Sequence, residues 1–185
     1  MRSFEFAVKK DGSWMYSDAK LPQYQTRGSA GADFFCAKEV TIPSIWERVA
    51  NIMMRHSLHN LISLRDEVYD KDESLRISPT IVHTGIKASM YPDEVLNIYN
   101  RSSGPKKLGL ILANSVGVID SDYYGNPDND GEIMFAFYNF LPWSVTIKVG
   151  DRIGQGVFSK VLRPEVGAVI NNVDRAGGFG STGVK

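Results

Sequence analysis

The fold is decided by residues 109–125, which read GLILANSVGVIDSDYYG. The apolar residues 110–112 predict a buried strand, and the NSVG segment at 114–117 suits a tight turn. A second apolar pair at 118–119 leads directly to Asp120. We therefore expect a β-hairpin that carries a carboxylate and two tyrosines away from a rigid base. Such an acid can act as a general base beside a flat ligand, but taken alone these residues fit a solvated turn better.

The composition indicates a soluble protein with no bulk electrostatic attraction to other molecules. The chain has 185 residues, 43% of them hydrophobic, with 21 acidic and 21 basic side chains. The zero net charge argues against nucleic acid or an anionic membrane as a partner. The single cysteine, Cys36, cannot form an internal disulfide, which fits a reducing compartment. Because no signal-peptide core or membrane-length apolar run is present, we expect a cytoplasmic protein.

Most of the chain has the pattern of short strands separated by turns that contain Gly or Pro. The predicted strands cover residues 4–8, 32–37, 40–42, 80–86, 94–99, 133–138, 144–149 and 153–161. Many short strands with one helical segment favour an all-β sandwich or barrel that carries a helical insertion. We expect residues 1–185 to form a single domain, with an inserted helix and loop at 43–78 and a flexible, glycine-rich arm at 174–185.

The exception to the β pattern is a predicted helix over about residues 44–67. Ser44 fits an N-cap, and Glu47 three residues later completes a capping box. Apolar side chains then recur at helical spacing along the first turns. That stripe, which includes Met53, is more typical of a core than of an interface. The polar segment 66–78 predicts a solvated loop.

Two stretches have the composition of an anion-binding site. The first is Arg101-Ser102-Ser103, where a guanidinium, two hydroxyls and backbone N–H groups can donate to phosphate oxygens. The second is GGFGSTG at 177–183, which adds hydroxyls and a phenyl ring that can stack on a flat ligand. Either stretch alone is weak support, because segments rich in glycine and serine are usually loops.

Five segments in order along the chain resemble the five motifs of the trimeric dUTP diphosphatases (dUTPases). They are AGADFFCA at 30–37, NRSSGPKKLGL at 100–110, NSVGVIDSDYYG at 114–125, GDRIGQGVF at 150–158 and RAGGFGSTG at 175–183. The resemblance implies a dUTPase-like β-barrel or jelly-roll, with the predicted helix inserted between motifs one and two. It also implies a homotrimer with shared active sites, in which the C-terminal arm closes over a neighbouring subunit's site.

The resemblance implies roles for residues that would read the nucleoside and perform the chemistry. Asp120 would orient and deprotonate the water that attacks the α-phosphorus of dUTP. A narrow pocket along the hairpin would reject the methyl group of thymine and the reversed hydrogen-bonding edge of cytosine. Tyr123 would lie under the deoxyribose, where a 2′-hydroxyl would clash. The residues implied for base and sugar are Asn114, Gly117, Ile119, Tyr123 and Phe179.

For the triphosphate, the resemblance implies a set of hydrogen-bond donors together with Mg²⁺. The ion would sit on the phosphate oxygens and spread the developing charge. Asp33 corresponds to an acid that works near the metal, mostly through water. The implied phosphate-binding residues are Arg101, Ser102, Ser103, Gln155, Arg175, Ser181 and Thr182. The products would be dUMP and pyrophosphate.

Three features depart from the family pattern. Asn100 stands where proline usually precedes the Arg-Ser pair, and Ala32 replaces a larger residue before Asp33. The helix at about 44–67 is foreign to the minimal family domain. It could pack on the outside of a trimer, replace a loop or recruit a protein partner, and the sequence leaves these alternatives open.

Two alternative functions are compatible with parts of the sequence. A dCTP deaminase would share the fold, but its chemistry needs a glutamate in the strand after the third motif. Here that strand reads MFAFYNF at 134–140, and Glu132 lies before it. A nucleotide-gated regulatory binding protein could use the helical insertion as its contact surface. Binding alone would not require the acid, the tyrosine, the phosphate donors and the closing arm that this chain retains.

Overall fold

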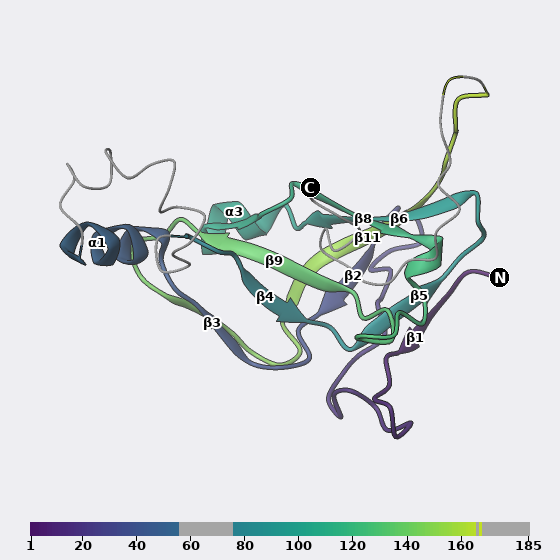
Figure 1. Cartoon of the computed structure of the whole chain (residues 1–185), viewed down its shortest axis with the longest axis horizontal. Helices are drawn as coiled ribbons and strands as arrows, with labels where there is room; N and C mark the ends of the chain where they lie inside the picture. Colours follow the sequence, from purple (N-terminus) through teal and green to yellow (C-terminus); the bar gives the residue numbers. More distant parts are fainter. Residues whose placement is uncertain (56–75, 166, 168–185) are drawn as a thin grey trace.

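The computed structural model describes residues 1–55, 76–165 and 167, and most of the regular structure among them is β-strand (Figure 1). The strands are β1 (Ser3–Phe6), β2 (Ala32–Phe35), β3 (Val40–Ile42), β4 (Thr80–His83), β5 (Ile86–Ser89), β6 (Glu94–Asn100), β7 (Leu110–Leu112), β8 (Val116–Asp120), β9 (Met134–Asn139), β10 (Val145–Ile147) and β11 (Arg152–Lys160). The helical segments of the same residues are α1 (Ile45–Arg55), α3 (Ser103–Leu108) and the 3₁₀ turn η2 (Ser121–Tyr123). The predicted all-β fold class is confirmed.

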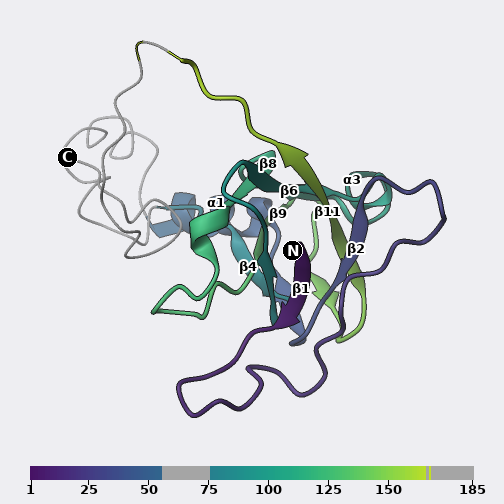
Figure 2. The ribbon, with the colours of Figure 1, turned by 90° about the vertical axis from the view of Figure 1, so that its right-hand side faces the viewer.

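The strands form four antiparallel sheets, two of which are large enough to enclose a core. The larger sheet has the order β2-β11-β6-β8, and the second has the order β4-β9-β7. Two-stranded sheets, β1-β5 and β10-β3, extend the structure. In Figure 2, β8, β6, β11 and β2 lie side by side across the molecule in that order. None of the helices in the described part of the chain has the length and apolar character needed to cross a membrane.

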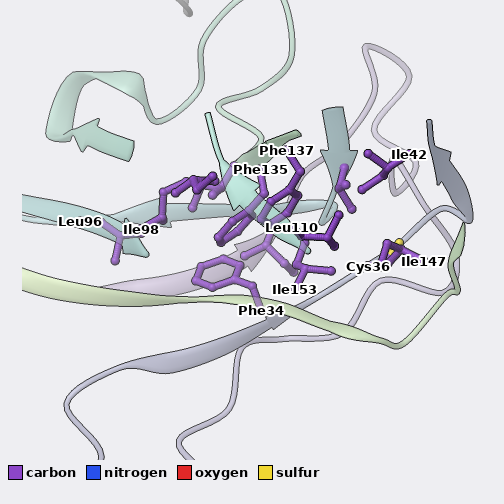
Figure 3. Close-up of a cluster of buried hydrophobic side chains, with 14 of the residues drawn as sticks. Phe34, Cys36, Ile42, Leu96, Ile98, Leu110, Phe135, Phe137, Ile147 and Ile153 are labelled. Atoms are coloured by element: carbon purple, nitrogen blue, oxygen red, sulfur yellow. The ribbon is translucent and has the colours of Figure 1, made fainter. Parts of the chain in front are cut away.

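The core takes side chains from all four sheets, and three buried phenylalanines, Phe34, Phe135 and Phe137, lie within it (Figure 3). The ring centroid of Phe34 on β2 lies 5.7 Å from that of Phe135 on β9, so the two sheets meet through these rings. Gly154 and Gly156 on β11 face this contact. A Cβ atom on Gly154 would overlap the Phe135 ring, and one on Gly156 would lie 2.7 Å from Cε2 of Phe34. The glycines of the fourth motif therefore allow the rings to pack directly on the β11 backbone.

The predicted hairpin between residues 110 and 120 is wrong in its pairing. β7 pairs with β9 in the smaller sheet, whereas β8 pairs with β6 in the larger one. The turn between them, with Ser115 at φ 55°, carries the chain from one sheet to the other. Turn residues show where a chain reverses, but the pairing of the flanking strands depends on partners far away in the sequence.

Residues 80–86, predicted as one strand, form two strands that belong to different sheets. The chain breaks at Gly85, whose φ of +66° is favourable for glycine. Thr84 fixes the break, because its buried Oγ1 donates to the carbonyl of Ile133 and accepts from the N–H of Ile86. The threonine is β-branched and so looked like an ordinary strand residue in the sequence.

The helix begins where it was predicted, and α1 lies at the end of the molecule opposite β1 and β5 (Figure 1). Ser44 is its N-cap, because Oγ accepts from the N–H of Trp46 at 3.1 Å. The predicted capping box does not close: the Glu47 carboxylate accepts instead from Ser144 Oγ. The expected core role of the apolar stripe is wrong, since no residue of α1 is buried and Met53 is 52% exposed. The predicted continuation over 56–67 lies outside the described residues.

Candidate functional site

Three of the predicted phosphate-site and metal-site residues come together at one end of the larger sheet. Gln155 on β11 lies directly opposite Asp33 on β2, and on its other side it lies opposite Tyr99 of β6. Arg101 follows β6 by one residue, so it projects from the same end. Neighbouring antiparallel strands place such partners about 4.5–5.5 Å apart. The sheet register thus brings motifs one, two and four together.

Arg152, which was not predicted as a site residue, connects this group. Its Nη1 donates to Oδ2 of Asp33 at 3.1 Å, and its backbone carbonyl accepts from Nη1 of Arg101 at the same distance. The Asp33 side chain is only 13% exposed, so the guanidinium balances a carboxylate with limited access to water. A charged residue directly after the Gly150-Asp151 turn was the sequence signal that could have identified it.

The stretch after β6 was expected to be a loop at the end of a strand, but it forms the short helix α3. Ser102 occupies the N-cap position without a side-chain capping bond, and Ser103 begins the helix. Gly109 ends it with a left-handed φ of 59°. This helix was not predicted, because its six residues, which include Gly104 and Pro105, are too few to show a helical pattern of apolar side chains.

Asn100, one of the departures from the family pattern, connects α3 to the next strand. Its Nδ2 donates to the carbonyl of Leu110 at 2.7 Å. Its Oδ1 is buried, has no hydrogen-bond partner among the residues that the structure describes, and lies where a Cβ atom on Gly104 would stand. The Asn100 side chain therefore packs directly against Gly104, next to Arg101 and the two serines in the chain. Proline could not make the bond to Leu110.

The predicted base-reading residues lie along β8 and the turn before it. Gly117 is buried, and a Cβ atom there would overlap Ile98 and come within 3.2 Å of Asn114 Nδ2. The glycine thus lets the exposed Asn114 amide lie against the strand. Ile119 is half-buried and packs on the core. The structure therefore brings Asn114 and Gly117 together, with Ile119 two residues further along the same strand.

Asp120 and Tyr123 lie where β8 passes into η2. Asp120 is extended, with φ −74° and ψ 157°, and precedes the 3₁₀ turn that contains Tyr123. Tyr123 is 6% exposed, and its phenol oxygen accepts from Nδ2 of Asn129 at 2.8 Å. Tyr124 points elsewhere and donates its hydroxyl hydrogen to Glu5. That bond raises the pKa of Tyr124 and lowers the pKa of Glu5.

Asp120 lies toward one end of the larger sheet, and the group that contains Asp33, Arg101 and Gln155 lies toward the other end. In the antiparallel pairing of β6 with β8, Val116 lies opposite Tyr99, and Asp120 lies opposite Val95. The four-residue step from Val116 to Asp120 spans about 13 Å at the usual rise per strand residue. Arg101 lies beyond the Tyr99 end. Among the described residues of one chain, the structure therefore does not bring Asp120 next to Arg101 or Gln155, two of the predicted phosphate donors.

Glu132, the nearest acid to the strand after motif three, is built into the core. Its side chain is 2% exposed and accepts from the N–H of Gly85 at 2.9 Å. Its second oxygen lies 3.1 Å from Nδ1 of His83. A carboxylate held in this way supports the break between β4 and β5, which does not favour the proton-shuttling role that a deaminase would require.

Asp33 is the residue predicted to act near a metal ion. Within residues 1–55, 76–165 and 167, no three His, Cys, Asp or Glu side chains cluster in a way that could hold a metal ion. Asp33 is already paired with Arg152. The predicted residues of the C-terminal arm lie outside the described residues: Arg175, Phe179, Ser181 and Thr182.

Known proteins similar to this chain share one description. The family model described as dUTPase matches residues 60–183. A deoxyuridine 5'-triphosphate nucleotidohydrolase of Lactococcus lactis subsp. lactis is 50% identical over 103 residues, which cover 56% of this chain and 69% of that protein.

Solved structures agree with this likeness. The crystal structure of a dUTPase from Streptococcus mutans has a TM-score of 0.63 and 32% identity, and the match covers 89% of this chain and 99% of that chain. A dUTPase mutant from phage phi11 of S. aureus, which coordinates a structural Mg(II) ion, has a TM-score of 0.59 at 14% identity. That match covers 93% of this chain and 98% of that chain, and it concerns the fold alone.

Proposed function

The chain belongs to the dUTPase family and is a dUTP diphosphatase, and we propose that it uses Asp120 to activate the attacking water. The observation that carries the proposal is the position of Asp120 between β8 and η2. One short segment thus supplies Asn114 and Gly117 at its start, the acid in its middle and Tyr123 at its end. A rigid strand of this kind can hold all of them in a fixed relation to one bound nucleotide.

In the proposed reaction, the oxygen of a water molecule forms a bond to the α-phosphorus of dUTP. The bond from that phosphorus to the α–β bridging oxygen breaks, and pyrophosphate leaves with the electron pair. Asp120 accepts the proton of the attacking water, and dUMP remains. A positioned general base typically accelerates such a step on the order of 10²–10⁴-fold.

We assign the uracil to the turn between β7 and β8. The Asn114 amide can offer both a donor and an acceptor to the edge of the base. Gly117 leaves the space that this amide needs, and Ile119 adds an apolar surface. Tyr123 would form the wall beneath the deoxyribose. Phe179 of the C-terminal arm would cover the base.

We assign the triphosphate to the group at the end of β2, β11 and β6. The proposed donors are Arg101, Ser102, Ser103, Gln155, Arg175, Ser181 and Thr182. Mg²⁺, when bound to the phosphates, would supply charge neutralisation at the leaving group. Because Asp33 already pairs with Arg152, its carboxylate fits contact with the hydrated ion through water better than direct ligation.

The separation of Asp120 from Arg101 supports a homotrimer with shared active sites. In such a trimer, one chain supplies the acid of an active site and a neighbouring chain supplies its phosphate donors. We propose residues 1–185 as a single cytoplasmic domain that includes the 43–78 insertion and the 174–185 arm. A light-scattering mass near three chains is expected, and a stable monomer would exclude shared sites.

Mixing two inactive variants tests the shared site. Asp120→Asn and Arg101→Ala chains are each expected to lose turnover. Refolding them together should recover a fraction of the activity, because some sites of a mixed trimer combine an intact Asp120 with an intact Arg101. Refolding Asp120→Asn with itself is the matched control. No recovery, with mixed trimers demonstrated by mass, would place both groups in one chain's site.

The nucleotide panel separates this function from the deaminase alternative. Pyrophosphate should be released from dUTP far faster than from dTTP, dCTP or UTP when Mg²⁺ is present. Release of ammonia from dCTP would move the assignment to a deaminase.

We also propose that α1 receives a protein partner. It lies at one end of the molecule, and Trp46, Met53 and Met54 are each more than half exposed (Figure 1). Substituting Met53 and Met54 by Glu should abolish capture of such a partner without changing dUTP turnover. A change in turnover would instead assign α1 to the enzyme's own assembly.

A further inference from the structure

The phenol of Tyr123 is held by a residue that belongs to no motif. Nδ2 of Asn129 donates to the phenol oxygen at 2.8 Å. Asn129 lies in the loop between η2 and β9, which reads YGNPDNDGEI at 124–133. The contact joins a side chain of this loop to the ring that is proposed to lie beneath the deoxyribose.

Asn129 is itself fixed within the loop. Its Oδ1 accepts from the N–H of Gly131 at 3.2 Å, and its backbone carbonyl accepts from the N–H of Glu132 at 3.0 Å. Because the Gly131 N–H can only donate, the amide oxygen must face it, and this turns the NH₂ group toward Tyr123. The orientation of the amide is therefore determined by the backbone around it.

The loop is anchored on both sides of Asn129. Asp130 Oδ2 accepts from Lys87 Nζ at 2.7 Å and from the N–H of Val8 at 2.8 Å. Glu132 is buried and bonded to the backbone between β4 and β5. Gly131, at φ +78°, lies so close to η2 that a Cβ atom would overlap the carbonyl oxygen of Tyr123. The loop cannot withdraw from Tyr123 without breaking several of these contacts.

We propose that Asn129 is a positioning residue that fixes the Tyr123 ring and thereby sets the discrimination between dUTP and UTP. This inference rests on the proposed role of Tyr123 beneath the sugar. A ring rejects a 2′-hydroxyl by contact only if it cannot move aside, so the selectivity depends on what holds the ring. The hydrogen bond from Asn129 supplies that restraint at the tip of the side chain.

The test measures kcat/KM for dUTP, UTP and dTTP in Asn129→Ala, Tyr123→Phe and the double variant. Asn129→Ala removes the donor of the hydrogen bond between the two residues, and Tyr123→Phe removes its acceptor. The ratio of dUTP to UTP should fall by roughly fivefold in both single variants, which is the worth of one ordinary hydrogen bond. The double variant should show no further fall. The ratio of dUTP to dTTP should stay unchanged, because the base pocket is untouched.

Asn126→Ala is the matched control. Asn126 is a buried asparagine of the same loop, and its Oδ1 accepts from the N–H of Asp128. It should leave the ratio of dUTP to UTP at the wild-type value. An equal fall in Asn126→Ala would show a general loosening of the loop and would overturn the proposal. If Asn129→Ala does not fold, Tyr123→Phe still tests the bond without altering the loop.

The outcomes separate this inference from the proposed function. An unchanged ratio in Asn129→Ala or Tyr123→Phe, or multiplied effects in the double variant, would overturn the role of Asn129. Tyr123→Ala tests the premise about the sugar: if it also leaves the ratio unchanged, then Tyr123 does not read the deoxyribose. A fall in Tyr123→Ala with no fall in Asn129→Ala would retain the proposed function and reject only the inference.

Discussion

At the scale of single residues, the site depends on glycines that let other side chains approach. Gly117 lies inside β8, where Ile98 and the Asn114 amide occupy the space around its Cα. Gly154 and Gly156 play the same part on β11 beneath Phe135 and Phe34. None of these three glycines has a positive φ, so their role is close packing and not backbone freedom.

Gly117→Ala is expected to impair both stability and substrate binding. The added methyl group would overlap Ile98 Cγ1 and lie 2.7 Å from its Cδ1. Overpacking of this kind lowers the free energy of unfolding by about 1–3 kcal/mol. Urea denaturation and the KM for dUTP measure the two effects.

Removing the side chain that clashes provides the control for Gly117→Ala. In an Ile98→Ala background, Gly117→Ala should cost little or nothing, because Cγ1 and Cδ1 are gone. If Gly117→Ala alone has the same free energy of unfolding as the wild type, then the predicted clash with Ile98 does not occur.

The motifs predict the members of the candidate site, but they do not predict the residues that contact and support those members. The register places Asp33, Arg101 and Gln155 at one end of the sheet, and their roles at the metal and the phosphates stay predictions. Arg152 and Asn129 were missed, because the contacts that make them relevant join segments distant in space or irregular in conformation. Hydrogen bonds of that kind have no periodic signature in a sequence.

At the scale of elements, the loop after η2 is fastened to the N-terminal strand β1 and to β5. Lys87 is 11% exposed, pairs with Asp130 and lies 4.7 Å from the centroid of the Tyr124 ring. Burial disfavours its charge, but the bond and the charge of Asp130 leave the Lys87 pKa above its ordinary value. Glu5 completes the group through Tyr124.

Asp130→Asn is expected to destabilise the protein, because the Lys87 ammonium loses the carboxylate to which it is hydrogen-bonded. The substitution suits the site otherwise, since asparagine tolerates the φ of 56° and can still accept from Val8. We expect a loss of about 1–3 kcal/mol in the free energy of unfolding. Chemical denaturation checks it.

The double variant Lys87→Met with Asp130→Asn isolates the charge effect. It should recover most of the lost stability, because the buried ammonium is no longer present. If the double variant loses as much free energy of unfolding as the two single variants lose together, then the pairing of Lys87 with Asp130 does not explain the loss.

Element positions were predicted more successfully than element pairing. The start of α1, the extent of β3 and the apolar strand β9 followed from spacing and local composition. The pairing of β7 with β9, the break at Gly85 and the helix α3 did not. In each case a long-range bond or a tertiary contact outweighs the local preference, as the two bonds of Thr84 demonstrate.

At the scale of the whole molecule, two phenols, those of Tyr16 and Tyr124, respond to alkaline pH in the same direction. Burial, followed by the charge of Glu132, raises the pKa of Tyr16 to about 12. The Glu5 bond raises the pKa of Tyr124 as well. A raised pKa means that the folded state holds the proton more tightly than the unfolded state. The stability that this provides is present below the unfolded pKa and is lost as the pH rises through the folded value.

The stability of the wild-type protein should therefore fall between about pH 10 and about pH 12. Tyr16→Phe removes the titrating phenol, so its free energy of unfolding should fall less over the same window. Urea midpoints at about pH 8 and about pH 11 measure the difference. Parallel curves for wild type and Tyr16→Phe would show that the folded and unfolded phenols titrate alike.

The proposed assembly depends on one property of the whole molecule, which is the separation of Asp120 from Arg101 and Gln155, two of the proposed phosphate donors. The two groups lie toward opposite ends of a sheet whose register is fixed by seven pairings between β11 and β6 and five between β6 and β8. The sequence motifs predict the members of both groups, but the separation between the groups depends on the register of the sheet.

The measurement that tests the account most directly is pyrophosphate release from dUTP with Mg²⁺, made on the wild type and on Asp120→Asn, beside direct measurement of dUTP binding. The wild type should turn over dUTP, and Asp120→Asn should lose turnover on the order of 10²-fold or more while still binding the nucleotide. Wild-type turnover in Asp120→Asn would contradict the assignment of Asp120 as the base that activates the water.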